Sequence, residues 1–147
     1  GKIGLGGAPL GNMFRAIPED EAHATVSEAW NLGVRYFDTA PLYGSGLSEI
    51  RMGEALSQYP RDEYVLSSKV GRIMLDEMED PAKRDFGEKG GLFEHGLKNK
   101  ILNDYSADAT LRSIEDSLKR LKTDWILSGS TTRHRTSTVT AGWNSST

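Results

Sequence analysis

The chain has 147 residues, of which 37% are hydrophobic and 27% charged, and these values are typical of one soluble globular domain. Its net charge of −3 gives no basis for binding nucleic acid or an anionic membrane, and no apolar run approaches the roughly 20 residues that span a bilayer. Cysteine is absent, which excludes disulfides and thiolate metal sites and favours a cytoplasmic setting.

The first residues predict a strand, a loop and a helix. The stretch KIGLGGAPLG (residues 2–11) has a short apolar start followed by glycines, which suits one strand and the loop after it. A helix is expected to begin at Pro18, because proline is favoured in the first turn and three carboxylates follow at the positive end of the helix dipole. Gly33 is a good terminator of this helix.

Two more strands and one more helix follow at short spacing. Residues 34–40 (VRYFDTA) and residues 63–71 (EYVLSSKVG) are rich in β-branched and aromatic side chains and predict strands. Between them, Ser48 can cap a helix that must end before Pro60. Alternating strands and helices are typical of a parallel sheet with crossover helices. The sequence therefore predicts an α/β fold.

A long polar stretch separates the third strand from the last helix. Residues 72–103 carry charges and glycines without a sustained period, and loops of this length are usually functional lids or disordered. We therefore expect sparse regular structure in this segment, either as a functional lid or as a disordered loop. The helix after it has Ser106 as its cap and an apolar face made by Leu111, Ile114, Leu118 and Leu121.

Several stretches resemble known binding motifs but lack the residue spacing that those motifs require. GLGGAP (residues 4–9) has Pro9 where a dinucleotide fingerprint needs its third glycine. GEKGGLF (residues 87–93) is no phosphate loop, because Lys89 is not followed by Ser or Thr. No metal site is expected either, since the histidines are scattered and lack carboxylate partners at ligand spacing: His23, His95 and His134.

One group of residues does point to chemistry. Asp38 ends one predicted strand, Tyr43 lies in the loop after it, and Lys69 ends the next strand. Side chains at the carboxyl ends of parallel strands converge on one face, where α/β proteins bind ligands. There the ammonium favours the ionised phenol, so that Tyr43 can exchange a proton with an oxygen while Asp38 holds the ammonium. A structural ion pair and an ordinary loop tyrosine are the alternatives for each residue taken singly.

These residues carry a resemblance to a known family. FDTAPLYGSGLSEIRMGEAL and SSKVG resemble the motifs of the aldo-keto reductases, and Asp38, Tyr43 and Lys69 match three members of that family's catalytic tetrad. GLGGAPLGNMF, NDYSADATLRSIEDSLKRL and the long third loop (residues 72–103) further resemble the subgroup that acts on aldoses or pyridoxal. The resemblance implies that this third loop is a mobile segment that covers the substrate. The resemblance covers about residues 2–123.

The resemblance implies a fold, a cofactor and a reaction. It implies the N-terminal part of a (β/α)8 TIM barrel with about three βα units, which is incomplete because a full barrel needs about 250 residues. NAD or NADP would be held without a Rossmann fold, with Asp38 and Lys69 contributing to cofactor binding. Hydride transfer to or from a small carbonyl or sugar substrate would be paired with proton transfer at Tyr43. The open sheet edges of a partial barrel make self-association an expectation.

Residues 124–147 form a tail that departs from this pattern. In the family, the strand after the last helix ends in the tetrad histidine, whereas this chain continues with Ser, Thr, Arg and Gly. Reading the codons of Asp124, Trp125 and Ile126 one base early forces Leu-Asp, and reading Trp143 and Asn144 in the same frame forces Glu. We therefore expect an out-of-frame tail, with a natural Ser/Thr-rich linker as the alternative and a strand remnant possible at residues 124–127. The absent initiator Met likewise suggests a start inside a longer frame or a trimmed chain.

Three functions remain open on this basis. The first is an oxidoreductase of the family type, although the 147 residues alone are expected to be inactive. The second is an inert product of a damaged or miscalled gene. The third is a non-catalytic binding module on the same scaffold, which ranks last because no segment resembles a channel-docking motif.

Overall fold

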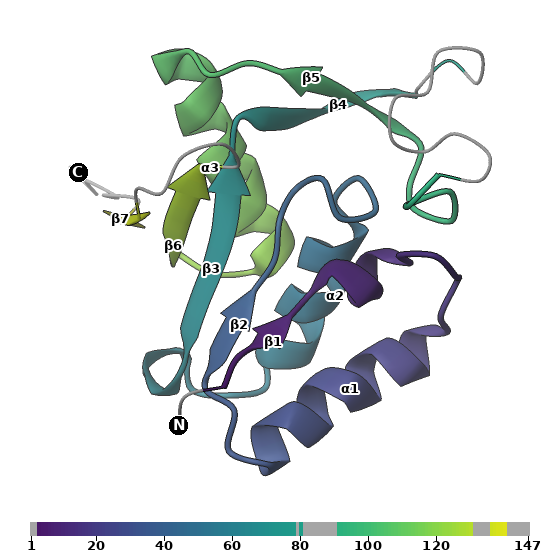
Figure 1. Ribbon diagram of the computed structural model, residues 1–147. Helices are drawn as coiled ribbons and strands as arrows, with labels where there is room; N and C mark the ends of the chain where they lie inside the picture. Colours follow the sequence, from purple (N-terminus) through teal and green to yellow (C-terminus); the bar gives the residue numbers. More distant parts are fainter. Residues whose placement is uncertain (1–2, 79, 81–90, 131–135, 141–147) are drawn as a thin grey trace, which may run out of the picture.

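The computed structural model describes residues 3–78, 80, 91–130 and 136–140, with side chains left undescribed at 128–130 and 136–140. Figure 1 shows a sheet with helices packed on one side and a separate strand pair above it. The strands of the main sheet lie in the order β1-β2-β3-β6-β7. Their bounds are Leu5–Gly6 (β1), Tyr36–Asp38 (β2), Val65–Val70 (β3), Trp125–Ser130 (β6) and Thr136–Thr140 (β7).

The first four strands of the sheet are parallel and are joined by crossover helices. Each neighbouring pair from β1 to β6 has parallel register, as the prediction of crossover connections requires. The three helices are α1 (Glu19–Asn31), α2 (Leu47–Leu56) and α3 (Ala107–Leu121). Short 3-10 turns at Ala8–Gly11 and Arg61–Glu63 lie in the connections. The chain thus forms three βα units followed by a fourth parallel strand, which is an incomplete part of an α/β barrel.

The core lies between the sheet and the helices. Alternate side chains of β2, β3 and β6 point toward the helices and are almost fully buried, as Phe37, Leu66 and Ile126 illustrate. Apolar residues of α2 belong to the same cluster, and Met52, Ala55 and Leu56 are each at most 1% exposed. One continuous apolar cluster therefore joins all three helices to the sheet.

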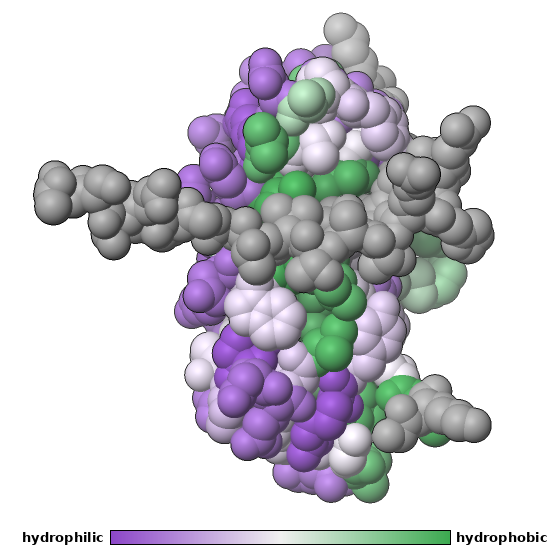
Figure 2. Space-filling model, turned by 90° about the vertical axis from the view of Figure 1, so that its left-hand side faces the viewer, coloured by the Kyte–Doolittle hydropathy of each residue, from purple (hydrophilic) through white to green (hydrophobic). Residues whose placement is uncertain are grey.

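The other face of the sheet carries no helix within the described residues. On this side Tyr36 is 44% exposed and Val65 is 38% exposed. Figure 2 looks onto the molecule from the side of β3 and β6 and shows patches of apolar surface in its upper and lower centre, with polar surface along the left side. Tyr36 and Val65 therefore remain in contact with solvent on this face.

The termini of α1 and α3 agree with their predicted signals. Pro18 precedes the first residue of α1 with extended backbone, and Gly33 follows the helix with φ of 87°. Ser106 caps α3 by accepting a hydrogen bond from the backbone N–H of Ala109. Leu111 is a correction, because it is 59% exposed, whereas the other three predicted apolar residues of α3 are buried.

The start of α2 is also corrected. Gly46, with φ of 97°, precedes the helix, and Ser48 lies inside it rather than at the cap position. The hydroxyl of Ser48 donates to the carbonyl of Gly7 at 2.6 Å and lies 2.8 Å from the hydroxyl of Thr39. Ser48 therefore ties α2 to the loops after β1 and β2, a long-range contact that a capping rule does not include.

The expectation of sparse regular structure in residues 72–103 is wrong. β4 (Arg72–Met78) and β5 (Asn99–Asn103) pair antiparallel, with a register shift between Met74 and Met78. The pairing is favoured because β4 lies against α3 and buries apolar side chains, with Ile73 at 4% and Met74 at 8% exposure. Residues 79 and 81–90 of the predicted loop lie outside the described residues.

The last strand differs in direction from the parallel strands. β7 pairs antiparallel with β6, from Trp125 opposite Thr140 to Gly129 opposite Thr136. An all-parallel barrel would place its next strand at this edge of β6 in the same direction as β6. The sheet therefore departs from the barrel pattern within residues 124–147.

No helix in the described part of the chain is long and apolar enough to cross a membrane.

Candidate active site

The strand register brings Asp38 and Lys69 together. Asp38 is the last residue of β2 and lies opposite Ser67 of β3. Because side chains alternate along a strand, Ser67 and Lys69 point to the same face as Asp38. The Nζ of Lys69 is 2.8 Å from Oδ2 of Asp38 and also donates to the carbonyl of Thr39 at 2.9 Å. The expected ion pair is therefore formed at the carboxyl ends of two neighbouring strands.

Ser67 completes the surroundings of the carboxylate. Its hydroxyl donates to Oδ1 of Asp38 at 2.6 Å, so that both oxygens of Asp38 accept hydrogen bonds. The phenol oxygen of Tyr36 lies 3.0 Å from the same hydroxyl. Sequence reasoning did not identify Ser67. The alternation of β3 was the available signal, because Ser67 is two residues before Lys69 and shares its face.

Tyr43 lies next to this ion pair. It belongs to the loop between β2 and α2, and its ring centroid is 5.1 Å from Nζ of Lys69, within the range of a cation–π contact. The structure thus brings together the three residues that the sequence singled out. Partial exposure keeps the pair accessible to a ligand, since the side chain of Asp38 is 33% exposed and that of Lys69 is 24% exposed.

An aromatic contact from a distant segment supports the ring of Tyr43. Phe93, which follows the undescribed residues of the third loop, stacks on Tyr43 with a centroid distance of 5.8 Å and an interplanar angle of 28°. Phe93 is only 6% exposed. Its position far along the chain explains why sequence reasoning missed this contact. The third loop therefore packs against the ring of Tyr43 through Phe93.

Three glycines join the loops around Tyr43. A Cβ on Gly11 would lie 2.5 Å from the carbonyl carbon of Tyr43, and a Cβ on Gly96 would lie 2.6 Å from Cα of Gly44. The backbone N–H of Leu97 donates to the carbonyl of Gly44 at 3.0 Å. The loop after β1, the loop after β2 and the third loop therefore pack backbone against backbone around Tyr43, and a side chain at these glycines would separate them.

Arg51 fixes the first of these loops. It is 5% exposed and donates from its guanidinium to the carbonyl of Leu10 at 2.9 Å, to Oδ1 of Asn12 at 2.7 Å and to Oε1 of Glu19 at 2.6 Å. Asn12 in turn donates to the carbonyl of His95 at 2.8 Å. Hydrogen bonds from one rigid guanidinium thus hold the loop that contacts Tyr43.

The histidines and acids do not form a metal centre in the described residues. No group of three His, Asp or Glu side chains there could hold a metal ion. His23 lies on α1 at 4.0 Å from Glu54, and His95 is exposed. His134 lies outside the described residues.

Comparisons with known proteins agree with this geometry. Residues 2–126 match the model of the Aldo/keto reductase family. D-threo-aldose 1-dehydrogenase of a Pseudomonas species is 49% identical over 85 residues, covering 58% of this chain and 25% of the relative. Pyridoxal 4-dehydrogenase of Microbacterium luteolum is 38% identical over 122 residues, covering 81% of this chain and 35% of the relative.

Solved structures show the same partial coverage. The glycerol dehydrogenase from Gluconobacter oxydans superposes with a TM-score of 0.60 at 27% identity, covering 84% of this chain and 32% of that one. An aldo-keto reductase from Klebsiella pneumoniae in complex with NADPH has a TM-score of 0.53 at 25% identity, with 84% and 32% coverage. This chain therefore spans about a quarter to a third of the proteins it matches. With the family model matching most of its length, the chain belongs to the aldo-keto reductase family.

Proposed function

We propose that this chain carries the proton-transfer part of an NAD(P)-dependent oxidoreductase that acts on an aldose or on a pyridoxal-like aldehyde or alcohol. The observation that carries the proposal is the contact of Lys69 with both Asp38 and the ring of Tyr43, on a partly exposed face at the strand ends. The aldose and pyridoxal dehydrogenases among the relatives support the substrate class.

In the proposed reaction each of the three residues has one role. In the reducing direction, the hydroxyl of Tyr43 gives its proton to the carbonyl oxygen as a hydride adds to the carbonyl carbon; in the oxidising direction, Tyr43 takes the proton of the substrate hydroxyl. The charge of Lys69 stabilises the phenolate that remains. Asp38, held by Ser67, keeps that ammonium beside the ring.

The nicotinamide cofactor, NAD or NADP, supplies or takes up the hydride when it is bound. The residues present fit a polar ligand at this place, because Asp38 and Lys69 offer an acceptor and a donor and neither side chain is sealed in the core. We assign both residues to the cofactor site as well as to catalysis.

The chain of 147 residues alone is proposed to lack turnover. It spans about a third of the solved barrels, and positioning of the cofactor supplies a large part of any lowering of the barrier. We also propose that residues 124–147 are translated out of frame, while residues 1–123 are the barrel portion. The antiparallel direction of β7 supports a departure from the barrel pattern after β6, and the family match ends at residue 126, three residues past the proposed boundary.

The test compares two purified proteins. One is the chain as given, and the other is translated from the same gene after a one-base correction at the codons of Thr123 to Trp125. Both are assayed with NAD and with NADP against a panel of aldoses and pyridoxal, by following the absorbance of the reduced nicotinamide. We expect turnover only from the corrected protein. Turnover by the chain as given would show that a partial barrel is sufficient and would contradict the proposed inactivity.

The substrate class and the out-of-frame tail are two separate parts of the proposal, and each has its own contradicting result. A corrected frame that yields a soluble protein with no activity on any substrate of the panel would contradict the substrate class. A genomic or transcript sequence that confirms the present frame through Thr147, together with a stably folded product, would contradict the out-of-frame tail instead.

A further inference from the structure

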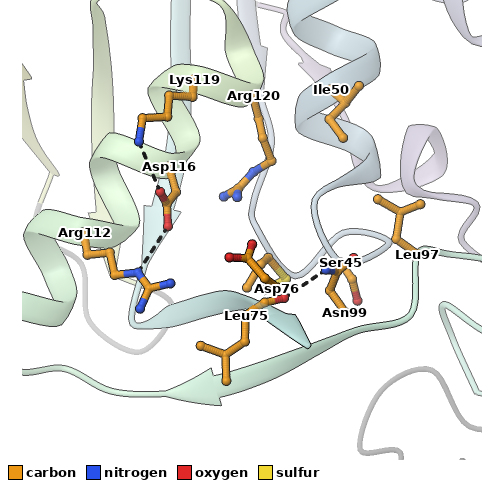
Figure 3. Close-up of a pocket in the computed structure, with 11 residues that line it drawn as sticks. Ser45, Ile50, Leu75, Asp76, Leu97, Asn99, Arg112, Asp116, Lys119 and Arg120 are labelled. Carbon is orange, nitrogen blue, oxygen red and sulfur yellow. Dashed lines mark hydrogen bonds and ion pairs between the residues drawn. The ribbon is translucent and has the colours of Figure 1, made fainter. Parts of the chain in front are cut away.

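A cavity of about 470 Å³ lies outside the catalytic face, between α2, α3 and the β4–β5 strand pair. Figure 3 shows its lining residues, which come from all three of these parts and from the loop before α2. Its volume falls within the range of roughly 300–1,000 Å³ that is usual for small-molecule sites. None of the residues assigned to the reaction lines it.

One wall of the cavity holds a cation in a fixed position. The Nε of Arg120 is 2.6 Å from Oε2 of Glu49, whose side chain is fully buried. The hydroxyl of Ser68 donates to the other carboxylate oxygen of Glu49 at 2.6 Å. The side chain of Arg120 is 18% exposed, and its guanidinium points into the cavity (Figure 3). A buried acid thus orients the arginine before any ligand is bound.

The opposite wall offers acceptors. The carboxylate of Asp76 on β4 points across the cavity toward Arg120 (Figure 3), yet among the described residues no ion pair within 4.0 Å includes Asp76. Asn99 on β5 donates its Nδ2 to the carbonyl of Leu75 at 2.9 Å, so its Oδ1 stays available as an acceptor. The hydroxyl-bearing side chain of Ser45 lies in the same lining. Donors and acceptors therefore face each other across an open space.

The outer rim adds positive charge. Arg112 and Lys119 lie 3.5 Å and 3.9 Å from the same carboxylate, that of Asp116. Two cations share one acid, so this group of three side chains carries one net positive charge. Apolar side chains, among them Ile50, Met74 and Leu97, form the rest of the lining.

We infer that this cavity binds a polyhydroxylated carboxylate, the chemical class of a sugar acid. Its carboxylate would be recognised by Arg120 with the cations of the rim, and its hydroxyls would donate to Asp76 and Asn99. Acceptors spread over β4, β5 and the loop before α2 fit several hydroxyls better than the single ammonium of an amino acid. This site goes beyond the proposed function. The site could be linked to the proposed function, because oxidation of an aldose gives a lactone and hydrolysis of that lactone gives a sugar acid. This link rests on the proposed function, whereas the binding itself does not need it.

The experiment follows methyl resonances of the chain as given. The protein is labelled with ¹³C at the methyl groups of methionine and isoleucine and titrated with sodium D-gluconate. Met74 and Ile50 line the cavity, whereas Met52 is buried in the core and serves as an internal reference. We expect saturable shifts at Met74 and Ile50 with a dissociation constant of about 1 mM or tighter. D-glucose and inorganic phosphate, which each lack half of the recognised groups, should bind about tenfold more weakly.

Matched variants test the cavity itself. Asp76→Asn and Arg112→Gln change exposed side chains and should each weaken gluconate binding about tenfold, the effect of losing one charged hydrogen bond. Glu77→Gln is the control, because it removes the same charge one residue away on β4, outside the lining. Absence of saturable shifts at Met74 and Ile50 overturns the inference. So does an equal effect of Asp76→Asn and Glu77→Gln, or equal binding of phosphate and gluconate.

Discussion

Gly44 and Gly11 lie so close together that a Cβ on Gly44 would overlap the carbonyl oxygen of Gly11. Gly44 also has φ of 65°, a conformation that favours glycine. The contact joins the loop that bears Tyr43 to the loop after β1. The position of the proposed proton donor therefore depends on two residues that have no side chain.

Replacing Gly44 by alanine should destabilise the fold by about 2–4 kcal/mol, through backbone overlap and a strained left-handed conformation. Urea unfolding followed by circular dichroism measures the change. Gly6→Ala is the matched control, because nothing lies within 4 Å of a Cβ built at Gly6. A Gly44 variant as stable as the Gly6 variant would contradict the close contact.

Phe93 is predicted to hold the ring of Tyr43. In Phe93→Leu, the ring protons of Tyr43 should lose the ring-current shift that the stacked pair produces, with little loss of secondary structure. Two-dimensional NMR of the aromatic region measures this shift, with Tyr43→Phe used to assign the signals. Leu92→Ala changes an exposed neighbour and should leave the shift in place. An unchanged Tyr43 spectrum in Phe93→Leu would show that the stack is absent in solution.

Asp38 and Lys69 should be energetically coupled. A double-mutant cycle of Asp38→Asn and Lys69→Met is expected to give a coupling free energy of about 1 kcal/mol, because the pair is partly desolvated and reinforced by Ser67. The same cycle on Glu77 and Lys100, an ion pair with both side chains more than half exposed, should give a value near zero. Equal coupling in the two cycles would show that the site does not strengthen the pair.

The sequence allowed prediction of those parts of the site that depend on local patterns. Strand propensity and the parallel alternation placed Asp38 and Lys69 at neighbouring strand ends, where the register then fixed their contact. Phe93 and Gly96 were missed because their partners lie some fifty residues earlier, and no local rule encodes such a contact. The β4–β5 pair was missed for a related reason: its strands are separated by a long polar segment, and the burial of Ile73 and Met74 arises only in the folded chain, where β4 lies against α3.

The exposed face of the sheet should make the chain self-associate. Val65 is 38% exposed on the face that carries no helix in the described structure. Apolar surface that is exposed in this way favours contact with a second copy of the chain. Light scattering coupled to size exclusion should show a mass that rises with concentration. Val65→Lys should reduce this rise, whereas Leu111→Lys, a change at an exposed position on α3, should not. A monomer at all concentrations would contradict this expectation.

The role of Tyr43 is tested most directly by the turnover number of the frame-corrected protein after Tyr43→Phe. The substitution keeps the ring that stacks on Phe93 and removes only the hydroxyl that would carry the proton. We predict a loss of turnover of about a thousandfold with little change in KM, the scale of a positioned acid–base group. Tyr59→Phe, which removes a hydroxyl from a tyrosine stacked on Trp30 away from the site, should retain full activity. A Tyr43→Phe protein that turns over as fast as the Tyr59→Phe protein would contradict the assignment of Tyr43.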